Sequence, residues 1–265
     1  MRIQLFIIWV LSILIYTSCN EDIEVAKGYP TIIEETSTIE LNKKLGQIEQ
    51  TPMTNCVAVD RFGFVFFDYE SESCFDIDNW KNDSAKNVII SRAQDAFTEY
   101  AQFLNLPEGS NPDIQSISTH DGVSYNSFFE DHPDSLPPVW VASTAVQKYK
   151  DYKVRGTSLQ VMLSPDEVIG ISGHWYSEIS IPAIDNYSAE QAQDLLNNQT
   201  FTYSRTEILI AENTNWHHPQ KLIVPITRSG QIELHVCWAL YPGTWEILVD
   251  SQSGEVLSSI NISAI

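Results

Sequence analysis

The clearest hydrophobic pattern of this chain lies near its C-terminus. Over residues 233–241 apolar side chains alternate with polar or small ones, and the alternation resumes over residues 244–249. Successive side chains of a strand point to opposite faces, so this pattern predicts a β-hairpin that turns at Pro242-Gly243. One face of its first strand is expected to carry Leu234, Val236, Trp238 and Leu240.

Shorter runs rich in β-branched and aromatic residues predict further strands upstream. They cover residues 56–60 and 64–69 around Arg61-Phe62-Gly63, and residues 140–149, 152–156, 158–163, 168–176 and 222–226. The aromatic run at residues 64–69 is expected to be core, because large aromatic side chains are mostly buried. An aromatic binding face is the alternative for this run.

Two segments have the spacing of helices. Residues 84–106 carry an apolar stripe, with Ser84 as the N-cap and with Pro107 and Gly109 after the end. A shorter helix starts at Ser188, which forms a capping box with Gln191. Residues 20–50 are weakly patterned, and residues 113–138 are expected to be loop. This mixture predicts an α+β fold in which antiparallel sheets each pack on a helix. The residues of the short helix expected to face inward are Ala192, Leu195 and Leu196.

The N-terminus is typical of an exported protein. Residues 3–16 form an apolar run after Arg2, which predicts a secretory signal peptide and is too short for a transmembrane helix. Cys19 resembles the lipidated cysteine of a bacterial lipobox, and Asn20-Glu21-Asp22 resembles the surface-export signal of Bacteroidetes lipoproteins. This resemblance implies an outer-membrane lipoprotein, anchored to the membrane through Cys19 and exposed at the cell surface. The alternative is an ordinary signal peptide that is cleaved near Ser18.

Charge and composition exclude several classes of protein. The chain has 15 basic and 35 acidic residues, and its net charge of −20 repels nucleic acid and anionic lipid. A hydrophobic content of 43% is that of a globular chain rather than a disordered one. Export permits disulfides, so Cys56 and Cys74 are expected to join across the strand pair between them, with Cys237 as a buried thiol. The alternative, that all three are reduced, stays open, because an odd number fits no closed framework.

The sequence contains no motif that predicts catalysis. It lacks His-Glu-x-x-His, the Gly-x-Ser-x-Gly elbow and the phosphate and dinucleotide loops. His217 and His218 are neighbours, but adjacent residues do not face one metal site, so they are expected at a loop or strand end. Cys237 next to a histidine in space stays open as a nucleophile, although burial within a strand favours an inert thiol. We therefore expect no enzyme, no cofactor and no metal. Asp250 and Gly254 are expected to form a turn rather than a site.

Several of these segments resemble the propeptides of secreted metallopeptidases. The aromatic-containing strand followed by Asp250, a turn, Gly254 and Val256-Leu257 resembles the end of a PepSY module, and the Ser188 helix resembles its opening. Gln147-Lys148-Tyr149 and Gly156 resemble the fungalysin/thermolysin propeptide domain. The resemblance covers residues 85–263 and implies two related sheet-and-helix units. The predicted segments are a lipoprotein signal peptide at 1–18, a tether with a β-rich extension at 19–83, a propeptide-like domain at 84–182 and a PepSY-like domain at 183–265.

The function expected from this resemblance is binding. The sequence stops at Ile265 with no peptidase after the propeptide-like part. We therefore expect a lipid-anchored, exported binding protein that inhibits or chaperones a secreted metallopeptidase in trans. The alternative is a cell-envelope scaffold or a lipoprotein that binds glycan or peptide. In that alternative Trp140, Trp175 and Trp216 are expected to contact the ligand. Solvent-facing, coplanar rings would support binding, and buried rings would be plain core.

Overall fold

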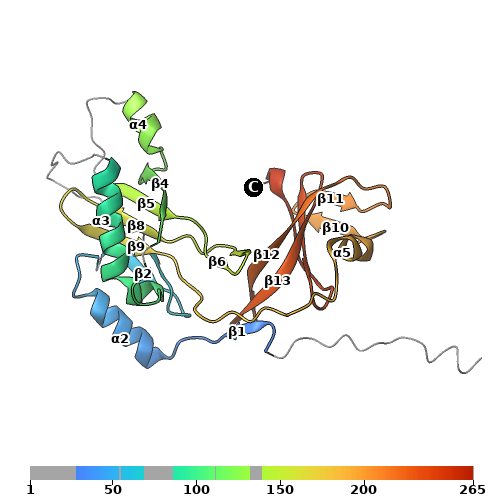
Figure 1. The fold of residues 1–265 in the computed structure, drawn as a ribbon, viewed down its shortest axis with the longest axis horizontal. Coiled ribbons are helices and arrows are strands. Elements are labelled where there is room, and N and C mark those ends of the chain that lie inside the picture. Colours follow the sequence, from blue (N-terminus) through green and yellow to red (C-terminus); the bar gives the residue numbers. More distant parts are fainter. Residues whose placement is uncertain (1–27, 54, 69–85, 111, 132–138, 265) are drawn as a thin grey trace, which may run out of the picture. The chain divides into compact units, whose positions relative to one another are not determined.

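The computed structural model describes residues 28–53, 55–68, 86–110, 112–131 and 139–264. These residues form two compact units, whose elements are drawn in Figure 1. The larger unit comprises Pro30–Ser180 and Lys221–His235, and the smaller unit comprises Ile181–Gln220 and Val236–Ile265 together with Tyr29. The predicted signal peptide and Cys19 lie outside the described residues. The four segments expected from the sequence stay predictions.

The larger unit is built on an antiparallel sheet with the strand order β4-β5-β8-β9. Its hairpin β8–β9 confirms the strands predicted at residues 158–163 and 168–176. A second antiparallel pair, β2–β3, meets β9 through a bridge between Val65 and Gly173, and it confirms the strand pair predicted around Arg61-Phe62-Gly63. The bounds are β2 Val57–Val59, β3 Val65–Phe67, β4 Ile114–Thr119, β5 Trp140–Thr144, β8 Gln160–Leu163 and β9 Val168–Ser172.

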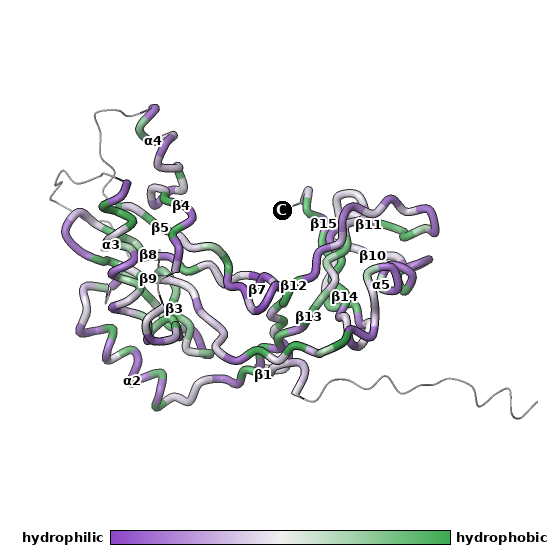
Figure 2. The backbone as a smooth tube through the Cα atoms, in the orientation of Figure 1, coloured by the Kyte–Doolittle hydropathy of each residue, from purple (hydrophilic) through white to green (hydrophobic). Residues whose placement is uncertain are grey.

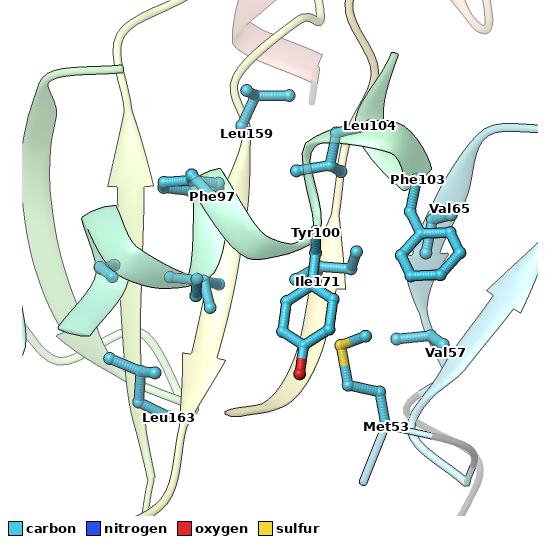
Figure 3. Packing of buried hydrophobic residues seen from close by; sticks show 14 of the residues in the cluster. Met53, Val57, Val65, Phe97, Tyr100, Phe103, Leu104, Leu159, Leu163 and Ile171 are labelled. Atoms are coloured by element: carbon cyan, nitrogen blue, oxygen red, sulfur yellow. The ribbon is translucent and has the colours of Figure 1, made fainter. Parts of the chain in front are cut away.

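Helix α3 (Lys86–Glu99) packs across β4, β5 and β8 and supplies much of the core of this unit. Figure 3 shows Phe97 from α3 in one cluster with Leu159 and Leu163 from the β8 segment. Phe97 is fully buried, and burial of such a side chain stabilises the fold by roughly 1.5–3 kcal/mol. The remaining labelled side chains of this core are Met53, Val57, Val65, Tyr100, Phe103, Leu104 and Ile171.

The predicted helix at residues 84–106 is right in kind and wrong at its C-terminal end. The α-helix ends at Glu99 and is followed by the 3-10 helix η2 (Ala101–Leu104). Asn105 then adopts the left-handed conformation with φ of 56°, which stops the helix before Pro107. Ser84, its predicted N-cap, lies outside the described residues.

The rest of the larger unit lies partly where no element was expected. Residues called weakly patterned form β1 and α2, and the segment expected to be loop contains β4 and the short helix α4. The strand expected at residues 140–149 divides into β5 and β6, which belong to different sheets. None of the described helices is both long and apolar enough to cross a membrane. The bounds are β1 Thr31–Ile33, α2 Thr38–Ile48, α4 Tyr125–Asp131, β6 Lys148–Tyr149 and β7 Tyr152–Val154.

The smaller unit contains the predicted C-terminal hairpin from Val236 onward, while the first residues of β13 (Gln231–Pro242) belong to the larger unit. Strand β13 pairs antiparallel with β14 (Trp245–Asp250), with Leu240 opposite Ile247. Strand β14 also pairs with β15, and helix α5 begins at the predicted Ser188–Gln191 capping box. Together these elements confirm an α+β fold. The remaining bounds are α5 Ala189–Leu195, β10 Thr200–Tyr203, β11 Thr206–Leu209, β12 Trp216–Arg228, β15 Val256–Asn261 and the 3-10 helix η3 Ile262–Ala264.

Burial in this hairpin differs from the alternation in the sequence. All six residues of β14 are buried, and Cys237 and Ala239 on the supposed outer face of β13 are fully buried. Figure 2 shows hydrophobic residues along β13 and β14 and hydrophilic residues over most of α2. The prediction for Leu195 is also wrong, because its side chain is 39% exposed while Ala192 and Leu196 are buried. A central strand covered on both faces needs no polar side.

The turn after β14 is a buried network of polar groups. One carboxylate oxygen of Asp250 accepts hydrogen bonds from the backbone N–H groups of Gln252 (2.7 Å) and Ser253 (2.8 Å). Gly254 follows with φ of +73°, and a Cβ there would lie 2.9 Å from Leu195 and from the ring of Tyr187. The turn therefore needs Asp for its acceptors and Gly for its conformation and its lack of a side chain.

Tyr29 ties the start of the described chain to this turn. Its hydroxyl donates to the second carboxylate oxygen of Asp250 at 2.7 Å and accepts from the backbone N–H of Val236 at 2.7 Å. Burial, reinforced by the Asp250 carboxylate, raises the pKa of Tyr29 far above its usual range. The tyrosine hydroxyl is therefore a permanent donor to Asp250 at physiological pH.

We expect Tyr29→Phe to lower the free energy of unfolding by about 2 kcal/mol, because it removes the donor of a buried carboxylate and the acceptor of a buried N–H. Urea denaturation measures the change. The matched control is Tyr187→Phe, whose hydroxyl makes no hydrogen bond within the described chain and whose loss should cost less than about 0.5 kcal/mol. Equal effects of the two variants would contradict this role of Tyr29.

Candidate binding groove

The larger unit carries a groove of about 260 Å³ beside strand β1. Four consecutive residues, Thr31 to Glu34, line one side, and four more, Trp175 to Glu178, line the other. We call it the β1 groove. Its remaining lining residues are Thr36, Phe62, Phe64 and Asn105.

Both sides of the β1 groove present backbone as well as side chains. Neighbouring side chains of a strand point in opposite directions, so the three residues of β1 line one cavity together only when the backbone edge of β1 faces it. Strand β1 is paired with β13, through Ile32 and Glu233 among others, and with no second strand in the described chain. A strand paired on one side leaves backbone donors and acceptors on its other edge.

The opposite wall is open in the same way. Within the residues that the structure describes, no hydrogen bond ends on the backbone of Trp175, Ser177 or Glu178. The two walls are joined at one end, where the backbone N–H of Ser180 donates to the hydroxyl of Thr31 at 2.6 Å. The groove is therefore closed at Thr31 and runs along β1 away from that point.

Gln147 fixes the position of the second wall. Its side-chain amide donates to the carbonyl of Tyr176 at 2.7 Å and accepts from the N–H of Tyr176 at 3.0 Å. The amide thus replaces the strand that would otherwise pair with Tyr176. Gln147 is 2% exposed, and its own N–H donates to Thr157. A buried amide with all these bonds made is rigid, so the wall is ordered before any ligand arrives.

Two aromatic residues of the groove, Phe62 and Phe64, come from the segment between β2 and β3. One oxygen of Asp60 accepts from the N–H groups of Phe62 and Phe64, both at 2.9 Å, which closes this turn. The ring of Phe64 stacks on His174 at 4.2 Å between centroids. The turn is tied to the chain after β1, because the N–H of Thr36 donates to the carbonyl of Arg61 at 2.9 Å.

His174 is a buried neutral ring behind the groove. Its Nε2 atom is buried and makes no hydrogen bond in the described part of the chain. Burial lowers the pKa of His174, with the charge of Asp60 acting in the opposite direction. At neutral pH the imidazole is therefore uncharged and packs as an aromatic ring.

A second cavity continues the groove beneath helix α2. It has a volume of about 300 Å³ and shares Thr36, Phe62 and Asn105 with the β1 groove. We call it the lysine pocket, because Lys43 and Lys44 both line it. The Lys44 ammonium donates to the carbonyls of Gly63 and Phe103, the latter at 2.8 Å. Burial lowers the pKa of Lys44 to about 8, and Asp60 opposes that shift.

The structure gives a partial account of the cysteines. Cys56 is disulfide-bonded, whereas Cys74, its predicted partner, lies outside the described residues, so the pairing stays a prediction. Cys237 is buried in β13.

The three tryptophans proposed as a binding platform have different environments. Trp140 is only 7% exposed and packs against Tyr125, Phe128 and Phe129 of α4. Trp175 is half-buried and lines the β1 groove. Trp216 is half-buried in the smaller unit, beside His217 and His218. Trp140 therefore belongs to the core, and Trp175 alone lies at the groove.

The histidine pair lies at the start of β12, as expected for a strand end. His217 and His218 line a cavity of about 390 Å³ with Glu190. Glu190 accepts a hydrogen bond from the Ser188 hydroxyl at the start of α5. No group of three or more metal-ligating side chains lies together anywhere in the described ranges.

Sequence reasoning missed the groove itself. Residues 31–34 have no pattern that distinguishes an edge strand from a linker. Lys43-Lys44 is the only pair of adjacent Lys or Arg residues in an acidic chain, and this is the one sequence signal that could have indicated the pocket. Gln147 was noted only as part of a resemblance, because a buried amide that pairs with distant backbone leaves no mark in the local sequence.

We expect Gln147→Leu to lower the free energy of unfolding by about 3 kcal/mol, because it leaves the N–H and the carbonyl of buried Tyr176 unsatisfied. Hydrogen exchange at residues 175–178 should accelerate as well. The control is Gln160→Leu, which removes a single 3.3 Å bond to Ser143 and should cost less than about 1 kcal/mol. Unchanged exchange in the wall would rule out this positioning role.

We also predict a pH dependence that His174→Phe removes. The folded state holds His174 with a pKa below its ordinary 6.5, so the unfolded chain binds the proton more readily. The stability that the neutral, buried His174 ring contributes is fully present above about pH 6.5. It is lost as the pH falls below this value and through the lower pKa of the folded state. Between about pH 7.5 and about pH 5, the wild type should therefore lose more unfolding free energy than His174→Phe. Denaturant titrations of both proteins at each pH measure this, and parallel losses would disprove it.

Comparison with known proteins finds a likeness among solved structures only. No protein-family model matches this chain, and no curated protein matches it. Among solved structures, the Bacillus megaterium YpeB C-terminal domain is similar over 86% of this chain and 98% of its own length. The sequence identity is 15% and the TM-score is 0.29, so the groove is interpreted from the geometry of this chain.

Proposed function

We propose that this chain is an exported, lipid-anchored binding protein that holds an extended segment of a partner polypeptide in the β1 groove. The observation that carries the proposal is the presence of open backbone along both sides of one cavity, at the unpaired edge of β1 and at Trp175, Ser177 and Glu178. An extended peptide forms main-chain hydrogen bonds with such edges, and side-chain pockets add specificity.

The chemistry of the lining fits a peptide. Ile32 is 43% exposed and offers an apolar surface, and Phe62 and Trp175 offer aromatic ones. Glu34 and Glu178 are exposed at the sides and favour a basic partner segment. The net charge of −20 would accelerate encounter with such a partner.

The partner that we propose is a secreted metallopeptidase, which the chain inhibits or chaperones in trans. This rests on the resemblance of residues 85–263 to propeptide and PepSY units. A lipid at Cys19 would hold the groove at the membrane surface and raise its local concentration near exported partners.

The groove is tested with fluorescent short random peptides and the full chain. Ser177→Pro removes an N–H from the open wall and adds bulk there, so we expect peptide affinity to fall at least about fivefold. Ser177→Ala keeps the backbone and should bind as the wild type does. Circular dichroism checks that both variants fold, and equal binding by a folded Ser177→Pro would refute the groove.

The peptidase link needs its own experiment. The full chain is mixed with each exported zinc peptidase of its source, and hydrolysis rate and refolding yield are measured. We expect slower hydrolysis or a higher refolding yield for at least one enzyme, and a loss of that effect in Ser177→Pro. If no enzyme responds while random peptides still bind, the groove stands and the envelope-scaffold alternative replaces the peptidase link.

A further inference from the structure

The lysine pocket contains a cation with one unused donor. An ammonium group has three N–H donors, and that of Lys44 gives two of them to the carbonyls of Gly63 and Phe103. Within the described residues nothing accepts the third. Two hydrogen bonds already fix the Lys44 side chain. A ligand that accepts the third N–H therefore binds without the entropic cost of ordering this side chain.

The charge around Lys44 favours an anion. Lys43 lines the same pocket, and the single carboxylate among the lining residues is Glu40. One oxygen of Glu40 already accepts from the Ser37 hydroxyl at 2.9 Å. Side-chain amides of Gln47 and Gln102 supply further donors in the pocket. Two ammonium groups in one cavity are unusual in a chain with more than twice as many acidic as basic residues.

The pocket lies at the open end of the β1 groove. The groove is closed where Ser180 meets Thr31, and it shares Thr36 with the pocket at its other end. An extended chain that runs along β1 away from Thr31 therefore arrives at Lys44. Helix α2 contributes four of the residues that line the pocket, so the helix borders the space that the chain enters.

We propose that the lysine pocket binds the free C-terminal carboxylate of the peptide held in the β1 groove. The inference rests on the proposed peptide-binding function and adds a direction and an end to the bound segment. One carboxylate oxygen accepts the third N–H of Lys44 in a charge-assisted hydrogen bond, and the amide donors of the pocket reach the other oxygen. A chain terminus fits a pocket bordered by a helix, because nothing has to pass beyond it.

The test compares peptides that differ only at their ends. Peptides enriched from a random library with free C-termini are remade as free acid, as C-terminal amide, and as amide with an internal glutamate. Fluorescence anisotropy with the full chain gives each dissociation constant. We expect the free acid to bind at least about tenfold more tightly than the amide, as for other hydrogen bonds between charged groups.

The variants place this difference on Lys44. In Lys44→Met the free acid should bind no better than the amide, because the charge that distinguishes the two peptides is gone. Lys43→Met removes a charge from the same helix without touching the two carbonyls, and it should keep most of the tenfold preference. Thermal denaturation confirms that each variant is folded.

Three results would overturn the terminal-carboxylate site, and they differ in what they leave of the peptide groove. Equal binding of acid and amide overturns the terminal-carboxylate site and leaves the peptide groove intact. An amide with internal glutamate that binds as tightly as the free acid shows a side-chain carboxylate subsite and also overturns the terminus. If no peptide of any form binds, the proposed function fails together with the inference.

Discussion

The hydrogen bonds between the Gln147 amide and the backbone of Tyr176 are the interaction on which the candidate site depends. A buried amide that meets both the N–H and the carbonyl of one residue imitates a neighbouring strand. It satisfies that residue from behind, so the rest of the wall turns its backbone edge toward the groove. The same interaction explains why an irregular segment, which forms no strand itself, has a fixed position.

In the smaller unit, too, a buried polar side chain holds distant segments in place through hydrogen bonds. Asp250 is 1% exposed, and its two carboxylate oxygens accept from backbone N–H groups and from the Tyr29 hydroxyl. A buried polar group is tolerated only when its partners are in place, and each such group then restricts where several distant segments lie. Asp250 and Gln147 therefore restrict the positions of the segments around them more strictly than apolar packing does, because apolar packing tolerates many arrangements.

The candidate site carries positive charge, whereas the chain as a whole is strongly acidic. A strongly acidic chain favours solubility and repels anions in general. Lys44 can still attract an anion, because backbone carbonyls rather than a carboxylate accept the hydrogen bonds of its ammonium group. No carboxylate is among its hydrogen-bond partners, and burial lowers its pKa to about 8, while the charge of Asp60 acts in the opposite direction. A site of this kind discriminates by the position of one charge rather than by net attraction.

The sequence by itself determined the elements that depend on local spacing. The hairpin of β13 and β14, the Ser188 capping box, the strand pair β2–β3 and the apolar stripe of α3 were all predicted, because residues near in sequence create these patterns. Only the tertiary structure decided what depends on distant residues. It buried both faces of β14, recruited residues 31–33 as an edge strand, and brought Gln147 to Tyr176 and Lys44 to Gly63. A groove formed by segments that far apart has no period along the chain, so no local pattern announces it.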